Sequence, residues 1–185
     1  MAARQQGRGE MGKREDNGGD TDDYSEFKED ELLYSSVGEW MIVRELGRGT
    51  ESIVFLAVHH RTGKKAAVKV VDITRLCRIE KMSRTQVRQR IEQQVTIIEE
   101  LDHPCIVRVK ETFWDKAKIF VLMDFVSGGE LLNHIDPKGV HEDDVKWVFL
   151  QLLYAVQHCH IRGVVHRDLK LDNVLVEEKE RTVKI

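Results

Sequence analysis

Apolar residues gather in short segments over the first two thirds of the chain, separated by glycines and turn-forming residues. Trp40, Ile42 and Leu46 are apolar and, with Arg44, follow a period of two. Residues 53–58 are apolar throughout, and residues 66–71 are rich in β-branched side chains. Gly47-Arg48-Gly49 separates the first two segments, and His60-Arg61-Thr62-Gly63-Lys64 has the turn chemistry to reverse the chain. The pattern predicts a three-stranded antiparallel meander.

A helix is predicted next. Ser83 is followed three residues later by Gln86, as in a capping box, and apolar residues recur at helical spacing at Val87, Ile91, Val95, Ile98 and Leu101. His103-Pro104 ends the helix. Two further segments with a β-strand pattern, 106–113 and 118–125, flank the turn-like residues 115–117. The expected sheet therefore has five strands and is accompanied by one helix.

The last third of the chain changes to a helical pattern. A short helical stretch is expected around residues 130–135, and a longer helix from about 142 to 160 begins with Glu142, Asp143 and Asp144, whose negative charge suits a first turn. Residues 147–156 are apolar nearly all round, with Gln151 as the exception, and such a helix must be buried on every side. Residues 164–185 suffice only for a loop and a small hairpin, so we expect the chain to be part of a larger lobe.

Charge is concentrated at the amino-terminal end. The 185 residues carry a formal net charge of -3, and residues 1–31 hold five basic and ten acidic side chains. Residues 1–35 contain few apolar side chains, so we interpret them as a disordered acidic tail preceding a domain at 36–185. The remainder is close to neutral, which argues against nucleic acid as a direct partner.

Three cysteines, Cys77, Cys105 and Cys159, are widely spaced and odd in number, as in a reduced intracellular protein. We expect a cytoplasmic or nuclear location and buried, unreactive thiols. The first 19 residues lack an apolar core, so we expect no signal peptide, and because no apolar run is long enough to span a membrane we expect no membrane segment. His158, His160 and His166 could in principle form a metal site, but we interpret them as residues of an ordinary helix end and the loop after it.

Two segments have chemistry suited to phosphate. Leu46-Gly47-Arg48-Gly49 enters a hairpin whose glycines let backbone N–H groups approach phosphate oxygens, although an ordinary glycine hairpin fits as well. Ala66-Ala67-Val68-Lys69-Val70 places one lysine in an apolar strand, where an ammonium needs an anion unless the strand lies at an edge.

A loop near the end of the chain reads His166-Arg167-Asp168-Leu169-Lys170-Leu171-Asp172-Asn173. This run resembles the catalytic loop of eukaryotic protein kinases and matches its His-Arg-Asp-Leu-Lys-x-x-Asn pattern at every fixed position. The glycine segment, the lysine strand, His103-Pro104 and Met123-Asp124-Phe125-Val126 follow in that family's order and spacing. The resemblance covers residues 39–185. It implies an α+β, protein kinase-like fold, with a complete small lobe at 36–126 and the first part of a helical large lobe at 127–185.

The resemblance also implies a reaction, the transfer of phosphate from ATP, with Mg²⁺, to Ser/Thr hydroxyls of a protein substrate. Asp168 would accept the hydroxyl proton, Lys170 would steady the transferred phosphoryl group, and Asn173 would hold Mg²⁺. Lys69 would pair with the α and β phosphates. The other implied nucleotide-binding residues are Leu46, Gly47, Gly49, Val54, Ala67, Asp124, Val126, Glu130 and Leu175, with Met123 at the back of the pocket.

The glycine segment and the helix depart from the family pattern. Ser52 replaces the third glycine, and Glu51 stands where an aromatic residue is usual, so a carboxylate is placed near the phosphates. Counting back from Pro104, the helix position that should carry a glutamate for Lys69 is Gln94. An amide still accepts a hydrogen bond but lacks the charge assistance of a carboxylate.

Neighbouring glutamates do not replace the missing one. At about 100° per residue, Glu92 and Glu99 lie roughly 160° and 140° around the helix from Gln94. The sequence also ends at Ile185, before the family's Asp-Phe-Gly metal motif, so we expect a truncated domain.

Two functions remain open from the sequence. The first is a serine/threonine protein kinase similar to the calcium/calmodulin-dependent or checkpoint-kinase-like group. The second is a pseudokinase-like or truncated-isoform binding module without transfer activity, suggested by Glu51, Ser52, Gln94 and the absent metal motif. The sequence does not indicate an oligomeric state.

Overall fold

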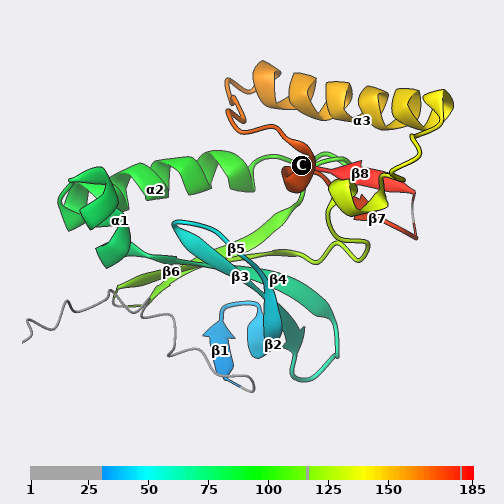
Figure 1. The fold of residues 1–185 in the computed structure, drawn as a ribbon. Coiled ribbons are helices and arrows are strands. Elements are labelled where there is room, and N and C mark those ends of the chain that lie inside the picture. Colours follow the sequence, from blue (N-terminus) through cyan, green and yellow to red (C-terminus); the bar gives the residue numbers. More distant parts are fainter. Residues whose placement is uncertain (1–30, 116, 180) are drawn as a thin grey trace, which may run out of the picture.

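The computed structural model describes residues 31–115, 117–179 and 181–185. A curled sheet forms one part of the molecule and α3 with a small hairpin forms the other (Figure 1). Residues 1–30 of the predicted tail at 1–35 lie outside the described residues. The elements in chain order are β1 (Leu32–Ser35), β2 (Gly38–Arg48), β3 (Ser52–His59), β4 (Lys65–Asp72), α1 (Ile73–Glu80), α2 (Arg84–Glu99), β5 (Val109–Asp115), β6 (Lys118–Asp124), the 3₁₀ turn η1 (Leu131–His134), α3 (Glu142–Ile161), the 3₁₀ turn η2 (Leu171–Asn173), β7 (Leu175–Glu177) and β8 (Thr182–Lys184).

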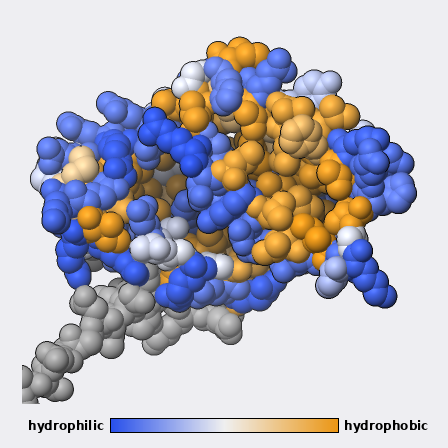
Figure 2. Space-filling model, turned by 45° about the horizontal axis from the view of Figure 1, so that its top comes forward, coloured by the Kyte–Doolittle hydropathy of each residue, from blue (hydrophilic) through white to orange (hydrophobic). Residues whose placement is uncertain are grey.

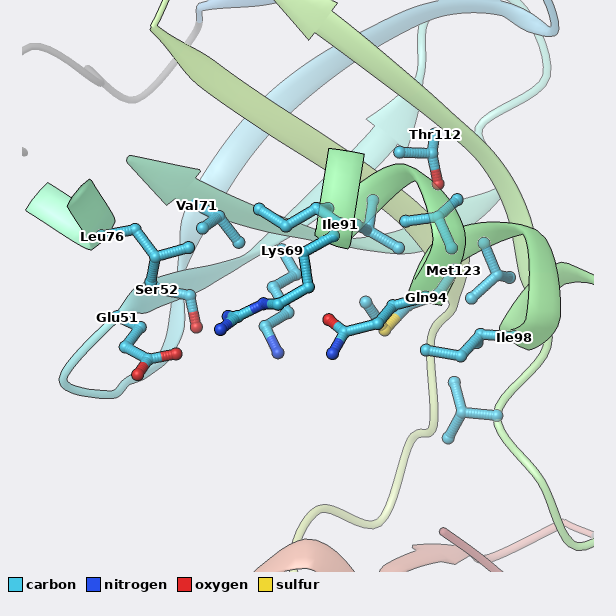
Figure 3. Close-up of a pocket in the computed structure, with 15 residues that line it drawn as sticks. Glu51, Ser52, Lys69, Val71, Leu76, Ile91, Gln94, Ile98, Thr112 and Met123 are labelled. Atoms are coloured by element: carbon cyan, nitrogen blue, oxygen red, sulfur yellow. The ribbon is translucent and has the colours of Figure 1, made fainter. Parts of the chain in front are cut away.

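The main sheet is antiparallel with the order β1-β2-β3-β4-β6-β5. The predicted meander is confirmed as β2–β4, and the two further strands as β5 and β6. Side chains alternate between the two faces. Val68 and Val70 are fully buried in the core on one face, whereas Lys69 and Val71 point to the other face, toward α2 (Figure 3). The register of β4 therefore aims Lys69 at the helix.

Strand β1 corrects the predicted extent of the tail, because Leu32–Ser35 is an ordered edge strand. Leu33 is buried against the sheet core, while Leu32 and Tyr34 face outward. The following turn is held by Glu111 of β5, whose carboxylate accepts hydrogen bonds from the N–H groups of Ser36 (2.9 Å) and Val37 (3.4 Å). A short segment with alternating apolar and polar side chains can pair with the edge of a sheet even when the residues before it in the sequence are mostly acidic.

Two helices, rather than the predicted one, cover the second face of the sheet. Helix α2 has the expected capping box between Ser83 and Gln86. Helix α1 was missed, although Asp72 caps it by accepting from the N–H groups of Thr74 and Arg75. Its buried residues, Ile73 and Leu76, pack with Val87, Ile91 and Ile119. Because the helix is only eight residues long and two of them are arginines, its two buried apolar residues are hard to recognise in the sequence.

The loop after α2 joins the sheet to α3. Leu101, Cys105 and Ile106 pack against Ala155 and Cys159 of α3. The predicted small hairpin is present as β7–β8, and it reaches this junction through backbone hydrogen bonds from Val107 N to Ile185 O (2.8 Å) and from Ile185 N to Cys105 O (3.0 Å).

Helix α3 confirms both the predicted range and the expected lack of cover. Gln151, Ala155 and Cys159 are buried, whereas the exposed fractions of Trp147, Phe149 and Tyr154 are 56%, 59% and 61%. Figure 2 shows extensive apolar surface on this side of the molecule. Among the described residues, no helix is both long enough and apolar enough to cross a bilayer.

Candidate functional site

At Gly47 and Gly49, in the segment that joins β2 to β3, neither the backbone conformation nor a neighbouring atom of the chain requires glycine. Neither residue adopts a positive φ, a Cβ at Gly47 would meet no atom within 4 Å, and one at Gly49 would make only an ordinary contact of 3.7 Å with Ser52 O. Close approach of an external group to the backbone is the remaining physical reason for glycine here. The Arg48–Glu45 ion pair (2.7 Å) lies beside this segment.

A cavity of about 320 Å³ lies between the sheet and the β7–β8 hairpin. Eight of the ten predicted nucleotide-binding residues line it, namely Leu46, Gly47, Val54, Ala67, Asp124, Val126, Glu130 and Leu175. Gly49 and Lys69 lie outside this lining. The cavity thus has aliphatic walls from both parts of the chain, as a flat heteroaromatic ring requires.

Charged residues at the cavity include two that sequence reasoning missed, Arg44 and Asp172. Arg44 is two residues before Leu46 on β2. Because side chains two apart along a strand lie on the same face, this spacing could have indicated Arg44 as a residue of the cavity. Asp124 is neutralised by Lys110, whose Nζ lies 2.8 Å from Asp124 Oδ1. The cavity lining therefore combines charged side chains with apolar ones.

The segment after β6 is attached to β7, which fixes Glu130 and Leu175 relative to each other. Gly128 N donates to Val176 O (2.8 Å), Val176 N donates to Gly129 O (2.8 Å), and a bridge pairs Glu130 with Leu175. A Cβ at Gly128 would lie 2.5 Å from Val176 O. Glycine is required at position 128 by this close backbone contact.

Lys69 projects into a second cavity of about 300 Å³ between α2 and the sheet (Figure 3). Met123 lines both this cavity and the first one, so the two adjoin. Gln94 also lines the second cavity, in agreement with the predicted helix register. Glu92 instead points to solvent and pairs with Arg88 (2.8 Å), as expected of a residue on another side of the helix. Lys69 forms no hydrogen bond or ion pair with any described residue.

Arg90 is a further cation in the lining of this second cavity and was not anticipated. It precedes Gln94 by one helical turn, which places both on one side of α2. Its guanidinium pairs with Glu80 of α1. Lys69 and Gln94 also line a third cavity of about 620 Å³, which reaches His166 and Arg167. That cavity connects the lysine to the loop before η2.

Asp168, Lys170 and Asn173 come together in that loop. Asn173 Nδ2 donates to both Asp168 O (2.7 Å) and Asp168 Oδ2 (2.8 Å), and Lys170 Nζ lies 3.5 Å from Asp168 Oδ2. The Asp168 side chain remains 68% exposed, so its carboxylate is accessible. Arg167 adopts a left-handed conformation (φ 65°), which is uncommon for a non-glycine residue and is often found at functional sites.

Two of the three cysteine thiols are buried, as predicted. Burial raises the pKa of Cys105 and of Cys159, and it outweighs the opposing effects of Lys184 on Cys105 and of Arg162 on Cys159. Cys77 lies on α1 and is partly buried against the apolar cluster that includes Val87 and Ile91 of α2. Within the described ranges, no group of three or more His, Cys, Asp or Glu side chains has the arrangement of metal ligands.

Comparisons with known proteins identify the family. The protein kinase domain model matches residues 40–185. The chain is 37% identical over 142 residues to CBL-interacting serine/threonine-protein kinase 19 of Arabidopsis thaliana, covering 77% of this chain and 28% of that protein. It is 38% identical over 141 residues to CBL-interacting serine/threonine-protein kinase 5 of the same species, covering 76% and 31%. The chain thus spans less than a third of these relatives.

A solved structure agrees with the sequence comparisons. Rad53 1–466 in complex with AMP-PNP superimposes with a TM-score of 0.68 and 31% identity, covering 79% of this chain and 37% of that one. The predicted family is confirmed. Because the family model spans nearly all described residues and the sequence relatives are serine/threonine enzymes, this chain belongs to the protein kinase family, in its serine/threonine branch.

Proposed function

We propose that the chain binds ATP with Mg²⁺ and provides the residues that transfer its phosphate to Ser/Thr hydroxyls of proteins. The observation that carries this proposal is the cluster of Asp168, Lys170 and Asn173, which follows directly on His166 and Arg167, two residues that line one cavity together with Lys69. Phosphoryl transfer depends on positioning and on electrostatic stabilisation, and these residues offer a base, two cations and a metal ligand.

The residues present fit a nucleotide. The first cavity offers aliphatic walls from Val54, Ala67 and Leu175 to a base, and Gly47 offers backbone without a Cβ to the phosphates. For Mg²⁺, which takes oxygen ligands, Asn173 is suitable because its Nδ2 is engaged with Asp168 and its Oδ1 remains for coordination. Bound Mg²⁺ would neutralise charge that develops on the phosphate oxygens.

The chain's own residues then have distinct tasks. Asp168 accepts the proton of the substrate hydroxyl at its carboxylate, held in place by the two hydrogen bonds from Asn173. Lys170, 3.5 Å from that carboxylate, stabilises negative charge on the transferred group. Lys69 binds phosphate oxygens through its ammonium, which forms no hydrogen bond with a described residue.

Phosphate transfer from labelled ATP to a Ser/Thr peptide library tests the proposal. The full chain and its Asp168→Asn variant are compared, with Asp136→Asn as a control for an exposed aspartate away from the loop. We expect the Asp168 variant to transfer about 10²- to 10⁴-fold more slowly, because the proton acceptor is lost. Equal rates for wild type and Asp168→Asn would contradict the proposal.

The second candidate is a binding module without transfer activity. The neutral Gln94 beside Lys69 and the carboxylate of Glu51 in the same cavity favour it. Thermal shifts with ATP, with and without Mg²⁺, distinguish the two functions, since a ligand that binds only the folded state raises the melting temperature. A shift that needs no Mg²⁺, together with no measurable transfer, would favour the binding module.

A further inference from the structure

A pair of histidines lies where the sheet part of the chain meets α3. The ring centroids of His103, in the loop after α2, and His158 of α3 are 5.0 Å apart. Cys105 of the same loop and Cys159 of α3 belong to one buried cluster at this junction (Figure 1). Residues from both sides of the junction line the third cavity, which Lys69 also lines. The histidine pair is therefore part of the contact that bounds this cavity.

Hydrogen bonds determine which ring nitrogens of the pair carry protons. His103 Nδ1 accepts from Cys105 N (3.1 Å), so this nitrogen carries no proton and the ring is neutral. Arg162 Nη1 lies 3.2 Å from His158 Nδ1, and since a guanidinium only donates, His158 Nδ1 is an acceptor as well. Each neutral ring then has its proton on Nε2. A second proton must therefore enter either ring at a nitrogen that already accepts a hydrogen bond.

The groups around the pair offer no negative charge to an added proton. Lys184 of β8 donates to the backbone of the loop after α2 (2.8 Å), and the two buried cysteine thiols stay neutral because burial raises their pKa. No carboxylate of a described residue forms an ion pair with either ring, and Asp102, next to His103 in the chain, is exposed. Burial, followed by the electrostatic effects of His158 and Lys184, lowers the pKa of His103. The Nε2 atom of His158 is buried and has no hydrogen-bond partner in the described part of the chain.

We propose that the His103–His158 pair is a pH-sensitive contact, in which a proton taken up by His103 at Nδ1 releases the Cys105 N–H and loosens the loop after α2 from α3. The proton comes from solvent and converts Nδ1 from an acceptor into a donor, so the hydrogen bond from Cys105 N breaks. The resulting imidazolium lies beside a second imidazole and the ammonium of Lys184, and this repulsion favours the open contact. The proposal does not rest on the proposed nucleotide function.

Hydrogen exchange at the Cys105 amide of the full chain tests the proposal. Protection is taken relative to the intrinsic exchange rate at each pH. If the open contact leaves His103 with the ordinary histidine pKa of about 6.5, lowering the pH from about 7.5 to 5.5 favours opening by at most about tenfold. We therefore expect Cys105 protection to be constant above the ordinary histidine value and to fall about three- to tenfold below it. Unchanged Cys105 protection over this range would overturn the proposal.

The test variant is His103→Asn, because an asparagine side chain also accepts from the N–H two residues later but does not titrate. We expect Cys105 protection in this variant to change less than about twofold over the same pH range. The matched control is His160→Asn, which removes an exposed histidine from α3 and should respond to pH as wild type does. An equal fall in wild type and His103→Asn, or the loss of the fall in His160→Asn, would overturn the proposal.

A second measurement needs only the wild-type chain and decides the question if His103→Asn does not fold. Deuterium exchange at the Cε1–H of each histidine, read by mass spectrometry, gives the pKa of His103. We expect this pKa to lie below the ordinary histidine value, and Cys105 protection to stop falling once the pH is below it, because both forms of the contact are then protonated. A His103 pKa at or above the ordinary value would overturn the proposal, and so would a fall in Cys105 protection that continues well below the measured pKa.

Discussion

Gln151 is a buried polar residue whose replacement has a calculable local effect. Only 8% of it is exposed, and its side chain connects α3 to the β7–β8 hairpin and to the loop after α2. Its Oε1 accepts from Val183 N (3.0 Å) and from Cys105 Sγ (3.7 Å), and its Nε2 donates to Trp147 O (3.4 Å). Gln151→Leu keeps a similar volume but leaves the buried Val183 N–H without an acceptor.

An unsatisfied buried donor costs about 1–3 kcal/mol. If the hairpin opens locally, protection of the Val183 amide against hydrogen exchange should fall about 5- to 140-fold, since about 1.4 kcal/mol corresponds to one factor of ten. Hydrogen exchange resolved to single amides measures the change in protection of the Val183 amide between wild type and Gln151→Leu. The measurement does not require the protein to unfold in one cooperative transition.

Gln157→Leu is the matched control, because Gln157 is an exposed glutamine on the same helix. A surface substitution of this kind changes stability by about 0.5 kcal/mol or less. We therefore expect Val183 exchange within about twofold of wild type in this variant. If Gln151→Leu and Gln157→Leu changed Val183 exchange equally, the hydrogen bond from Val183 would not hold the hairpin, and the reasoning would be refuted.

Three further predictions concern other parts of the molecule. The exposed apolar side of α3 should make the chain self-associate, and Phe149→Lys with Tyr154→Lys should raise the monomer fraction in light scattering; a monodisperse wild-type monomer with a sharp melt would contradict this. Burial raises the pKa of Glu111, but hydrogen bonds led by those from Ser36 outweigh it and lower the pKa overall. The β1–β2 turn should therefore be held fully above the ordinary carboxyl range and released as the pH falls through the lowered pKa. The protection of the Ser36 amide, taken relative to its intrinsic exchange rate at each pH, should then fall, and Glu111→Gln should remove this pH dependence. Asn173→Ala should abolish the Mg²⁺-dependent part of the ATP thermal shift and spare the Mg²⁺-independent part, and an unchanged Mg²⁺ response would exclude Asn173 as a ligand.

The sequence by itself determined the elements whose signals are local. The capping box at Ser83 and Gln86 needs only four residues in a row, and the strands β2–β6 follow from short apolar runs between turns. The side of α2 that carries Gln94 follows from helical geometry, because residues one turn apart lie on one face. The motif order likewise indicated the family without any contact being known.

Tertiary structure alone decided which distant residues meet. Strand β1 exists because Leu33 is buried in the sheet core and Glu111, more than 70 residues away, binds the turn after it. The approach of Glu51 to the Lys69 cavity depends on the β3–β4 register, and the pairing of Arg90 with Glu80 depends on how α1 packs on α2. Such contacts depend on packing between segments far apart in the chain, for which a local pattern of residues holds no signal.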